Sequence, residues 1–475
     1  MLNNRIGMKS PYLGAVPLHW CDECHVPVLG KRCACGGKTR FVGVTPPGDL
    51  RPAFPSDIEL INHLFEESFG SPLIPKDNLA LLNKVPDDDR MEEIIVGGAI
   101  VGAIRYLPGE GRWEVLPRPD ATRLMAPKLR YVIVDDAAAV FIKDGSSVLA
   151  PGVVEIESHV EKGDEVFVLT KDGTCIGVGR AKMGAEEGRG ISRGQVVRLR
   201  KNAPQVCCPG PGTWDDTVDA NREYLASMEA DSITFIRDLA EEEDLPVTVS
   251  YSGGKDSLVT LLLALKAIGP VPLLFADTGL EFPETLENIS AVSDRYSVPV
   301  LRGDGETGFW EGFSRHGPPA VNFRWCCKAC KLNPVRRLIE LEFGECISLI
   351  GQRKYESARR MKSRRVWRNP NVPNQLSAAP IQHWNALHVW LYLFQEKAPY
   401  NTLYEAGLDR IGCYMCPSSD IAHLRMIEGR YPELWDEWRS AVTEYAEATG
   451  RPPNWFESGA WRIKKGENDD EDSHY

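Results

Sequence analysis

Apolar and polar positions divide the chain into regions with different periods. A short apolar run, Val247–Tyr251, leads through two glycines into a longer one, Leu258–Ile268, and a second short run follows at Leu273–Ala276. Short apolar runs are typical of buried strands, whereas the longer run has the length of a helix. This alternation predicts an α/β domain with a Rossmann-like parallel sheet.

Two other regions have different patterns. Between residues 131 and 200, short β-rich runs alternate with glycine turns, which predicts a small β-barrel. Residues 50–130 combine a helix-like stretch, Ile58–Phe69, with two strand-like runs on either side of Gly97-Gly98, which predicts an α+β region with a hairpin. A further helix is expected from about Thr217 to Glu243.

Composition limits the class of protein. The chain has 475 residues, a net charge of −12 and 13 cysteines, and this length suits several domains. Its longest weakly polar stretch, Ile94–Ile104, is too short to cross a bilayer, and no signal peptide is recognised. We therefore expect a cytoplasmic protein without a membrane partner, in which clustered thiols hold metal rather than form disulfides.

The glycines after Tyr251 belong to a phosphate-binding pattern. Adjacent glycines bring backbone amides close to a ligand, and the following helix offers free N–H groups. The order of residues does not match the Walker loop. It resembles the loop of the PP-loop superfamily, which embraces the phosphates of ATP or a related adenine nucleotide. The resemblance implies nucleotide binding by Ser252, Gly253, Gly254, Lys255, Asp256 and Ser257.

Two later segments narrow the resemblance. Residues 277–285 read Asp-Thr-Gly-Leu-Glu-Phe-Pro-Glu-Thr and follow a predicted strand. They resemble the signature of the phosphoadenylyl-sulfate (PAPS) reductase family, which lies beside the adenosine. Residues 351–360 resemble the family's Gly-x-Arg-x-x-x-Ser-x-x-Arg segment. The resemblance adds to the nucleotide site Asp277, Thr278, Gly279, Arg353, Ser357 and Arg360.

Basic residues concentrate between positions 351 and 370. This stretch carries eight lysines and arginines against one acid, Glu356, in a chain that is acidic overall. Such a concentration indicates an anionic ligand, either sulfate or phosphate, or a nucleic-acid backbone.

Five cysteines form one of two thiol groups: Cys326, Cys327, Cys330, Cys413 and Cys416. Their spacing suits an iron–sulfur cluster. The pattern resembles that of iron–sulfur sulfonucleotide reductases, which implies a 4Fe-4S cluster on Cys326, Cys327, Cys413 and Cys416. A set with Cys330 in place of Cys326 is an equally good four-thiolate site and also suits zinc.

The second thiol group lies near the N-terminus, at Cys21, Cys24, Cys33 and Cys35. Two closely spaced pairs in a segment too short for a core predict a zinc ribbon. The barrel that follows resembles a PUA domain, which implies RNA as a partner. This order of parts resembles an archaeal-type architecture. The expected domains are a zinc ribbon (1–48), an α+β region (49–129), a PUA-like barrel (130–203), a linker and helix (204–245), the PP-loop domain (246–435), and a C-terminal helix with an acidic tail (436–475).

Two activities suit these parts. The first is iron–sulfur-dependent reduction of adenylyl sulfate (APS) or PAPS to sulfite, with Lys255, Asp256, Arg353 and Cys330 as catalytic residues and a ferredoxin- or thioredoxin-like electron donor. The second is ATP- and Mg-dependent thiolation of tRNA, with the PUA-like domain holding the RNA. A non-catalytic RNA-binding or sulfur-regulating protein is the third reading, and the intact loop from Ser252 to Ser257 disfavours it.

Overall fold

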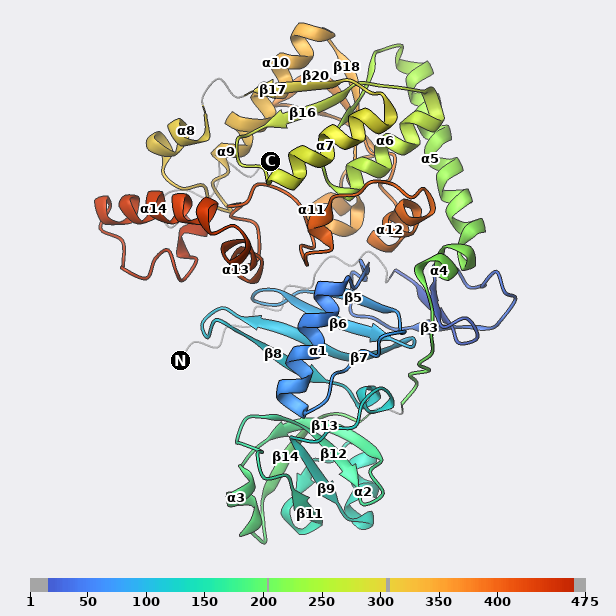
Figure 1. Cartoon of the computed structure of the whole chain (residues 1–475), viewed down its shortest axis with the longest axis vertical. Coiled ribbons are helices and arrows are strands. Elements are labelled where there is room, and N and C mark those ends of the chain that lie inside the picture. The colour runs from blue at the N-terminus through green and yellow to red at the C-terminus, as the bar shows by residue number, and fades with distance from the viewer. Residues whose placement is uncertain (1–15, 203–204, 305–307, 465–475) are drawn as a thin grey trace. The chain divides into compact units, whose positions relative to one another are not determined.

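The computed structural model describes residues 16–202, 205–304 and 308–464 (Figure 1). The described residues up to Tyr224 form one compact unit, and those from Leu225 onward form another. The predicted acidic tail from residue 467 lies outside the described residues.

The N-terminal unit contains three sheets that follow one another along the chain. A three-stranded antiparallel sheet has the order β2-β1-β3, a five-stranded antiparallel sheet the order β4-β5-β6-β7-β8, and a six-stranded sheet the order β10-β14-β13-β12-β9-β11. Their strands are β1 (Leu18–Cys21), β2 (Val26–Val28), β3 (Thr39–Val42), β4 (Arg51–Pro52), β5 (Ala80–Val85), β6 (Met91–Val96), β7 (Ala99–Leu107), β8 (Arg112–Pro117), β9 (Tyr131–Val134), β10 (Val148–Leu149), β11 (Val153–Ile156), β12 (Glu165–Thr170), β13 (Cys175–Ala181) and β14 (Gln195–Lys201).

The five-stranded sheet is covered by helix α1 (Pro55–Phe69), whose buried residues include Ile61, Phe65 and Phe69. Strands β6 and β7 form the predicted hairpin, and both turn glycines have positive φ angles, 53° for Gly97 and 67° for Gly98. Because L-residues with a Cβ rarely adopt such angles, glycine is required there.

The six-stranded sheet places its two edge strands next to each other in sequence. Strand β10 continues through the short turn η2 (Ala150–Gly152) into β11, while α2 (Asp136–Lys143) and α3 (Ala185–Arg189) accompany the sheet. Its core includes Val132, Val166 and Val197. The predicted β-rich fold of this region is confirmed.

The C-terminal unit is built on one six-stranded sheet with the order β17-β16-β15-β18-β20-β19. Its first five strands are parallel, and β19 pairs antiparallel at one edge. The strands are β15 (Val247–Ser250), β16 (Leu273–Asp277), β17 (Val300–Asp304), β18 (Cys346–Ile350), β19 (Val366–Asn369) and β20 (Val372–Ala378). The predicted α/β class with a parallel sheet is confirmed.

Helices surround this sheet and form a second core toward the C-terminus. Helix α10 packs against β16, β17 and β20, and α6 packs against β15 and β18. The second core includes Trp325, Trp435 and Trp438. The helices and helical turns are α6 (Lys255–Ile268), α7 (Pro283–Tyr296), α8 (Phe309–His316), α9 (Trp325–Cys327), η3 (Lys328–Leu332), α10 (Asn333–Glu342), η4 (Lys354–Glu356), α11 (Ala358–Met361), α12 (Ala386–Gln395), η5 (Thr402–Tyr404), α13 (Ile421–Arg430), α14 (Pro432–Ala448) and η6 (Ala460–Arg462).

The single helix expected from Thr217 to Glu243 is wrong. The chain forms α4 (Trp214–Ala220) and α5 (Arg222–Glu243), with a break at Asn221. The Asn221 side chain accepts a hydrogen bond from the Leu29 amide at 2.7 Å and donates to the Pro27 carbonyl at 3.0 Å. These bonds to the chain around β2 hold Asn221 outside the helical path.

Among the described residues, every helix is too short or too polar to cross a lipid bilayer.

Candidate functional site

The candidate site lies where the order of strands in the C-terminal sheet reverses. From β15 the chain moves outward through β16 and β17, and then returns to place β18 on the other side of β15. In open α/β sheets, ligands bind in the crevice beyond the carboxyl ends of the strands at such a reversal. The predicted loop, residues 252–257, follows β15, and the segment that begins at Gly351 follows β18.

Close backbone contact joins these two segments. A Cβ added to Gly351 would lie 2.5 Å from the Asp256 carbonyl carbon and 2.7 Å from the Ser257 amide nitrogen. Since real Cβ atoms do not approach backbone so closely, only glycine permits this packing. Gly253 has a φ of 72°, and a Cβ there would meet Thr285 at 2.7 Å. Both glycines are therefore required by the shape of the loop.

Hydroxyl groups line the same loop. Ser257 Oγ donates to the Gly254 carbonyl at 2.8 Å and accepts from the Ser252 amide at 3.3 Å. The two serine hydroxyls are 3.4 Å apart. Ser252 is exposed and Ser257 is buried, so the Ser252 hydroxyl is the more accessible of the two.

Asp256 is the centre of a buried group of charges. Its Oδ1 accepts from Arg353 Nε at 2.6 Å, and its Oδ2 accepts from Lys255 Nζ at 2.7 Å. The side chains of Arg353 and Lys255 are only 3% and 9% exposed. The structure thus brings together three predicted catalytic residues, two of them 97 positions apart.

The environment of these charges keeps Asp256 and Lys255 ionised. Burial by itself raises the pKa of the Asp256 carboxyl, but the charges of Arg353 and Lys255 outweigh it and hold that pKa below its ordinary value. Burial lowers the pKa of the Lys255 ammonium, but the Asp256 carboxylate outweighs it and raises that pKa. Arg353 contacts the loop through its guanidinium, which donates to the Asp256 carboxylate.

Ser357 and Arg360 lie on the turn that follows Arg353. Ser357 Oγ accepts from the Arg360 amide at 3.2 Å and caps the short helix α11. The Arg360 guanidinium pairs with Glu356, whose carboxylate also accepts from the Arg353 amide at 2.8 Å. With 43% of its side chain exposed, Arg360 is the more accessible of the two predicted arginines.

The segment after β16 connects the loop region to the cysteines. Asp277 Oδ1 accepts from the Gly279 amide at 3.1 Å, and Thr278 Oγ1 donates to Glu281 at 2.7 Å. Thr278 Oγ1 also lies 3.7 Å from Cys413 Sγ, and the Tyr414 amide donates to the Leu280 carbonyl at 3.0 Å. The predicted adenosine segment and the predicted cluster cysteines therefore share one site.

The five thiols come from two segments that pack together. In the first segment, Cys326 and Cys327 end α9 and Cys330 lies in the π-helical turn η3. In the second, Cys413 and Cys416 lie in a turn in which the Cys416 amide donates to the Cys413 carbonyl at 3.1 Å. Arg324 joins the segments by donating to Ser418 Oγ.

Positive charge surrounds these thiols. A hydrogen bond with Cys326 lowers the pKa of Cys327 most, whereas burial raises it. The positive charges of Lys331, Arg324 and Arg410 lower it further, to about 6. Burial raises the pKa of Cys330 to about 11, and this thiol is only 3% exposed. The nearby cations thus favour the thiolate form of Cys327, whereas burial opposes ionisation of Cys330.

The N-terminal thiols form a separate group in the other unit. The ligand atoms of Cys21, Cys24, Cys33 and Cys35 all lie within 4.8 Å of one another. Cys21 Sγ is 3.6 Å from Cys35 Sγ, and Cys33 Sγ is 3.9 Å from Cys24 Sγ. Four thiolates at about 2.3 Å from a tetrahedral metal ion are about 3.8 Å apart, so this group has the spacing that a single ion requires.

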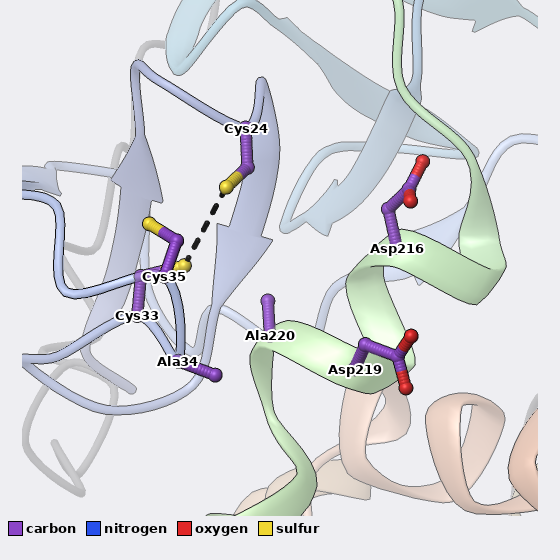
Figure 2. Close-up of a pocket in the computed structure, with 7 residues that line it drawn as sticks. All are labelled: Cys24, Cys33, Ala34, Cys35, Asp216, Asp219 and Ala220. Carbon is purple, nitrogen blue, oxygen red and sulfur yellow. Dashed lines mark hydrogen bonds between the residues drawn. The ribbon is translucent and has the colours of Figure 1, made fainter.

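The surroundings of the N-terminal thiols also suit a metal. Figure 2 shows three of the cysteines in a cavity of about 350 Å³, beside Asp216 and Asp219 of helix α4. The Gly37 amide donates to Cys35 Sγ at 3.2 Å and is the main cause that lowers the pKa of that thiol. Among the described residues, no other group of three or more potential ligands meets the same distance criterion.

Two residues of the C-terminal site were missed by sequence reasoning. Tyr404 Oη accepts a hydrogen bond from the Lys255 amide at 3.0 Å, and Glu281 accepts from both the Thr278 amide and its hydroxyl. Glu281 belongs to residues 277–285, which resemble the family signature, so the sequence holds a signal for it. Tyr404 is 149 positions from its partner and has no local pattern that indicates a role.

Comparisons with known families identify two domains of the chain. Residues 246–419 match the phosphoadenosine phosphosulfate reductase domain, and residues 130–202 match the PUA domain. Uncharacterized protein MJ0066 of Methanocaldococcus jannaschii is 39% identical over 472 residues, which cover 96% of this chain and 98% of that protein. Uncharacterized protein MJ0973 of the same archaeon is 25% identical over 412 residues, covering 86% and 93%.

Relatives with a named activity match a smaller region. Adenosine 5'-phosphosulfate reductase of Bacillus cereus is 26% identical over 207 residues, which cover 43% of this chain and 86% of that protein. The similarity to a named reductase therefore concerns one region, whereas the archaeal relatives match nearly the whole chain.

Proposed function

The chain belongs to the phosphoadenosine phosphosulfate reductase family and carries a PUA domain as well, and from this we propose that it reduces adenylyl sulfate or phosphoadenylyl sulfate to sulfite. In this reaction the S–O bond between the sulfate and the 5′-phosphate breaks. Two electrons enter, and sulfite and the adenosine phosphate leave. The adenine nucleotide is the part of the substrate that the PP-loop holds.

The observation that carries the proposal is the junction between the nucleotide segment and the thiols. Thr278, which directly follows β16, lies 3.7 Å from the sulfur of Cys413, and the backbone of Leu280 is bonded to that of Tyr414. Cysteines placed against this segment can hold a redox centre close to a bound nucleotide. The arrangement supports electron transfer to a group attached to the nucleotide.

Two arginines have different parts in the proposed site. Arg353 is bonded to Asp256 and 2% exposed, so we assign it to hold the loop in shape. Arg360 is exposed beside Ser357, so we assign it to the sulfate group of the substrate. Bidentate donation to oxyanions is the chemistry for which arginine is best suited.

Four of the five thiols are proposed to hold a 4Fe-4S cluster. Thiolate ligands and surrounding cations suit such a cluster, because the positive charges of Lys331, Arg324 and Arg410 offset those of the thiolates. Such a cluster would supply a one-electron redox centre beside Thr278.

The two electrons are assigned to a partner protein. A catalytic role of Cys330 stays a prediction; because this thiol is 3% exposed and burial raises its pKa to about 11, we do not assign the electrons to it. Either two one-electron ferredoxin-like molecules or one thioredoxin-like dithiol balances the reaction, and the dithiol would end as a disulfide.

Sulfite release under anaerobic conditions tests the proposal. The full chain is incubated with APS or PAPS and reduced methyl viologen or reduced thioredoxin, and its visible spectrum is recorded. We expect sulfite from one sulfonucleotide and a brown iron–sulfur absorbance. Asp256→Asn should abolish release, whereas Arg364→Ala, at an exposed position of the same basic segment, should not. No sulfite with any donor would reject the proposal.

The PUA domain favours a second candidate, thiolation of RNA. Here an oxygen of an RNA base attacks the α-phosphorus of ATP and pyrophosphate leaves. The terminal sulfur of a cysteine persulfide then attacks the base and displaces AMP. A second thiol cleaves the sulfur–sulfur bond, which leaves the sulfur on the base and forms a disulfide between the two thiols. ATP binding that tightens with tRNA, together with a thiolated nucleoside in the digested RNA, would support this candidate; ATP binding indifferent to tRNA would exclude it.

A further inference from the structure

Tyr404 contacts the nucleotide loop at the first residue of the helix that follows it. The first free amides of a helix normally bind an anion in sites of this kind. The amide of Lys255, the first residue of α6, donates instead to Tyr404 Oη at 3.0 Å. The hydroxyl also lies 3.4 Å from the place that a Cβ on Gly254 would take, and so does Ser252 Oγ.

We propose that Tyr404 is a phosphate-binding residue of this loop, whose hydroxyl accepts the Lys255 amide hydrogen and donates its own proton to a phosphate oxygen of the bound nucleotide. This inference rests on the proposed function only in that the ligand carries a phosphate. It applies equally to a sulfonucleotide and to ATP.

The hydroxyl proton is available for this purpose. A phenol can accept one hydrogen bond and donate another, and among the described residues no acceptor for the Tyr404 proton is found. A hydroxyl that already accepts a hydrogen bond is a stronger donor, because chains of such bonds polarise one another. Burial raises the pKa of Tyr404, which keeps the group protonated.

The ring is held in place from two sides. It packs edge to face on Trp390 with 4.9 Å between ring centroids. The turn η5 that carries it is capped by Asn401, whose side chain accepts from the Leu403 amide and donates to Thr285 Oγ1 at 3.2 Å. Thr285 in turn packs against Gly253 of the loop. Tyr404 is thus positioned before any ligand arrives.

Tyr400 provides a matched control. Its ring also meets Trp390 edge to face, at 5.2 Å, but its hydroxyl donates to Glu405 at 2.8 Å rather than to the loop. Tyr400→Phe and Tyr404→Phe therefore remove the same atom beside the same tryptophan, and only the second removes it from the loop.

Binding of inorganic pyrophosphate, APS and ATP is measured by calorimetry with the full chain and both variants. We expect Tyr404→Phe to weaken binding of all ligands that the wild type binds by about tenfold or more, as loss of a hydrogen bond to a charged group does. Tyr400→Phe should leave binding unchanged. Unchanged or tighter binding in Tyr404→Phe overturns the inference, and so does a wild type that binds none of the three ligands.

Two further measurements keep the test decisive. Thermal unfolding shows whether each variant is folded. If Tyr404→Phe is not, the tyrosine difference spectrum of the wild type is recorded with pyrophosphate, and the absence of a shift to longer wavelength overturns the inference. Pyrophosphate binding that depends on Tyr404, without any sulfite release, would reject the reductase proposal and leave this inference in place.

Discussion

Replacing Asp256 by Asn removes the negative charge between two buried cations. Arg353 and Lys255, whose side chains are 3% and 9% exposed, would then face each other without a counter-charge. Breaking a buried ion pair in this way costs about 3–5 kcal/mol. For a unit of roughly 150–250 residues, each kcal/mol lowers the unfolding temperature by about 2–4 °C, so we expect a decrease of about 6–20 °C.

Differential scanning calorimetry of the full chain measures this shift. The control is Glu311→Gln, which breaks an exposed pair with Arg315 on α8 and should change stability by less than about 0.5 kcal/mol. A decrease for Asp256→Asn no larger than that of the control would refute the reasoning, because the charges would then not be buried as the structure places them.

The ion pairs of Asp256 with Arg353 and Lys255 also predict how the stability of the protein depends on pH. The folded pKa of Asp256 lies below its unfolded value, because Arg353 and Lys255 outweigh the effect of burial. Its stabilisation is therefore fully present above the unfolded pKa of about 3.9 and is lost as the pH falls through the folded pKa. The difference in unfolding temperature between wild type and Asp256→Asn should shrink below about pH 4; a difference that grows there would contradict the assignment.

Three other substitutions test the site. Arg353→Ala should weaken sulfonucleotide binding by about 1–3 kcal/mol, since the loop loses the group that holds Asp256, whereas Arg364→Ala should not; equal effects in calorimetric titration would refute this role. Cys33→Ser should lower bound zinc, measured by elemental analysis, and leave the visible spectrum unchanged; zinc retained at one ion per chain would contradict the ribbon. Cys413→Ser should remove iron and the brown absorbance, whereas substitution of the buried Cys346 by Ser should keep both. Iron retained in Cys413→Ser would exclude Cys413 as a cluster ligand.

Some parts of the site could be predicted because neighbouring residues determine them. The run of two glycines between a short and a long apolar segment predicted a strand, a turn and a helix, and α6 begins at Lys255 within that turn. The four N-terminal cysteines form two closely spaced pairs, a spacing typical of zinc sites. The structure brings them within 4.8 Å.

Other predictions failed or could not be made, because residues far apart in sequence decide them. The helix expected across Asn221 is broken by bonds to Pro27 and Leu29, about 190 positions earlier, which outweigh helix propensity. The basic segment predicted an anionic ligand at Arg353, which stays a prediction; that Arg353 Nε also donates to Asp256, 97 positions away, could not be predicted, because it depends on the packing of β18 beside β15.

The sequence by itself determined which residues can do chemistry and the local frame of each: the glycine-rich turn, the two thiol groups, and the strand and helix on either side of the loop. Only the tertiary structure decided which of these residues meet, how deeply the charges of Asp256 and Arg353 are buried, and that Tyr404 reaches the first amide of α6. The reason is physical. Local structure follows from the backbone preferences of adjacent residues, whereas pairing and burial depend on how strands that are far apart in the chain come to lie side by side.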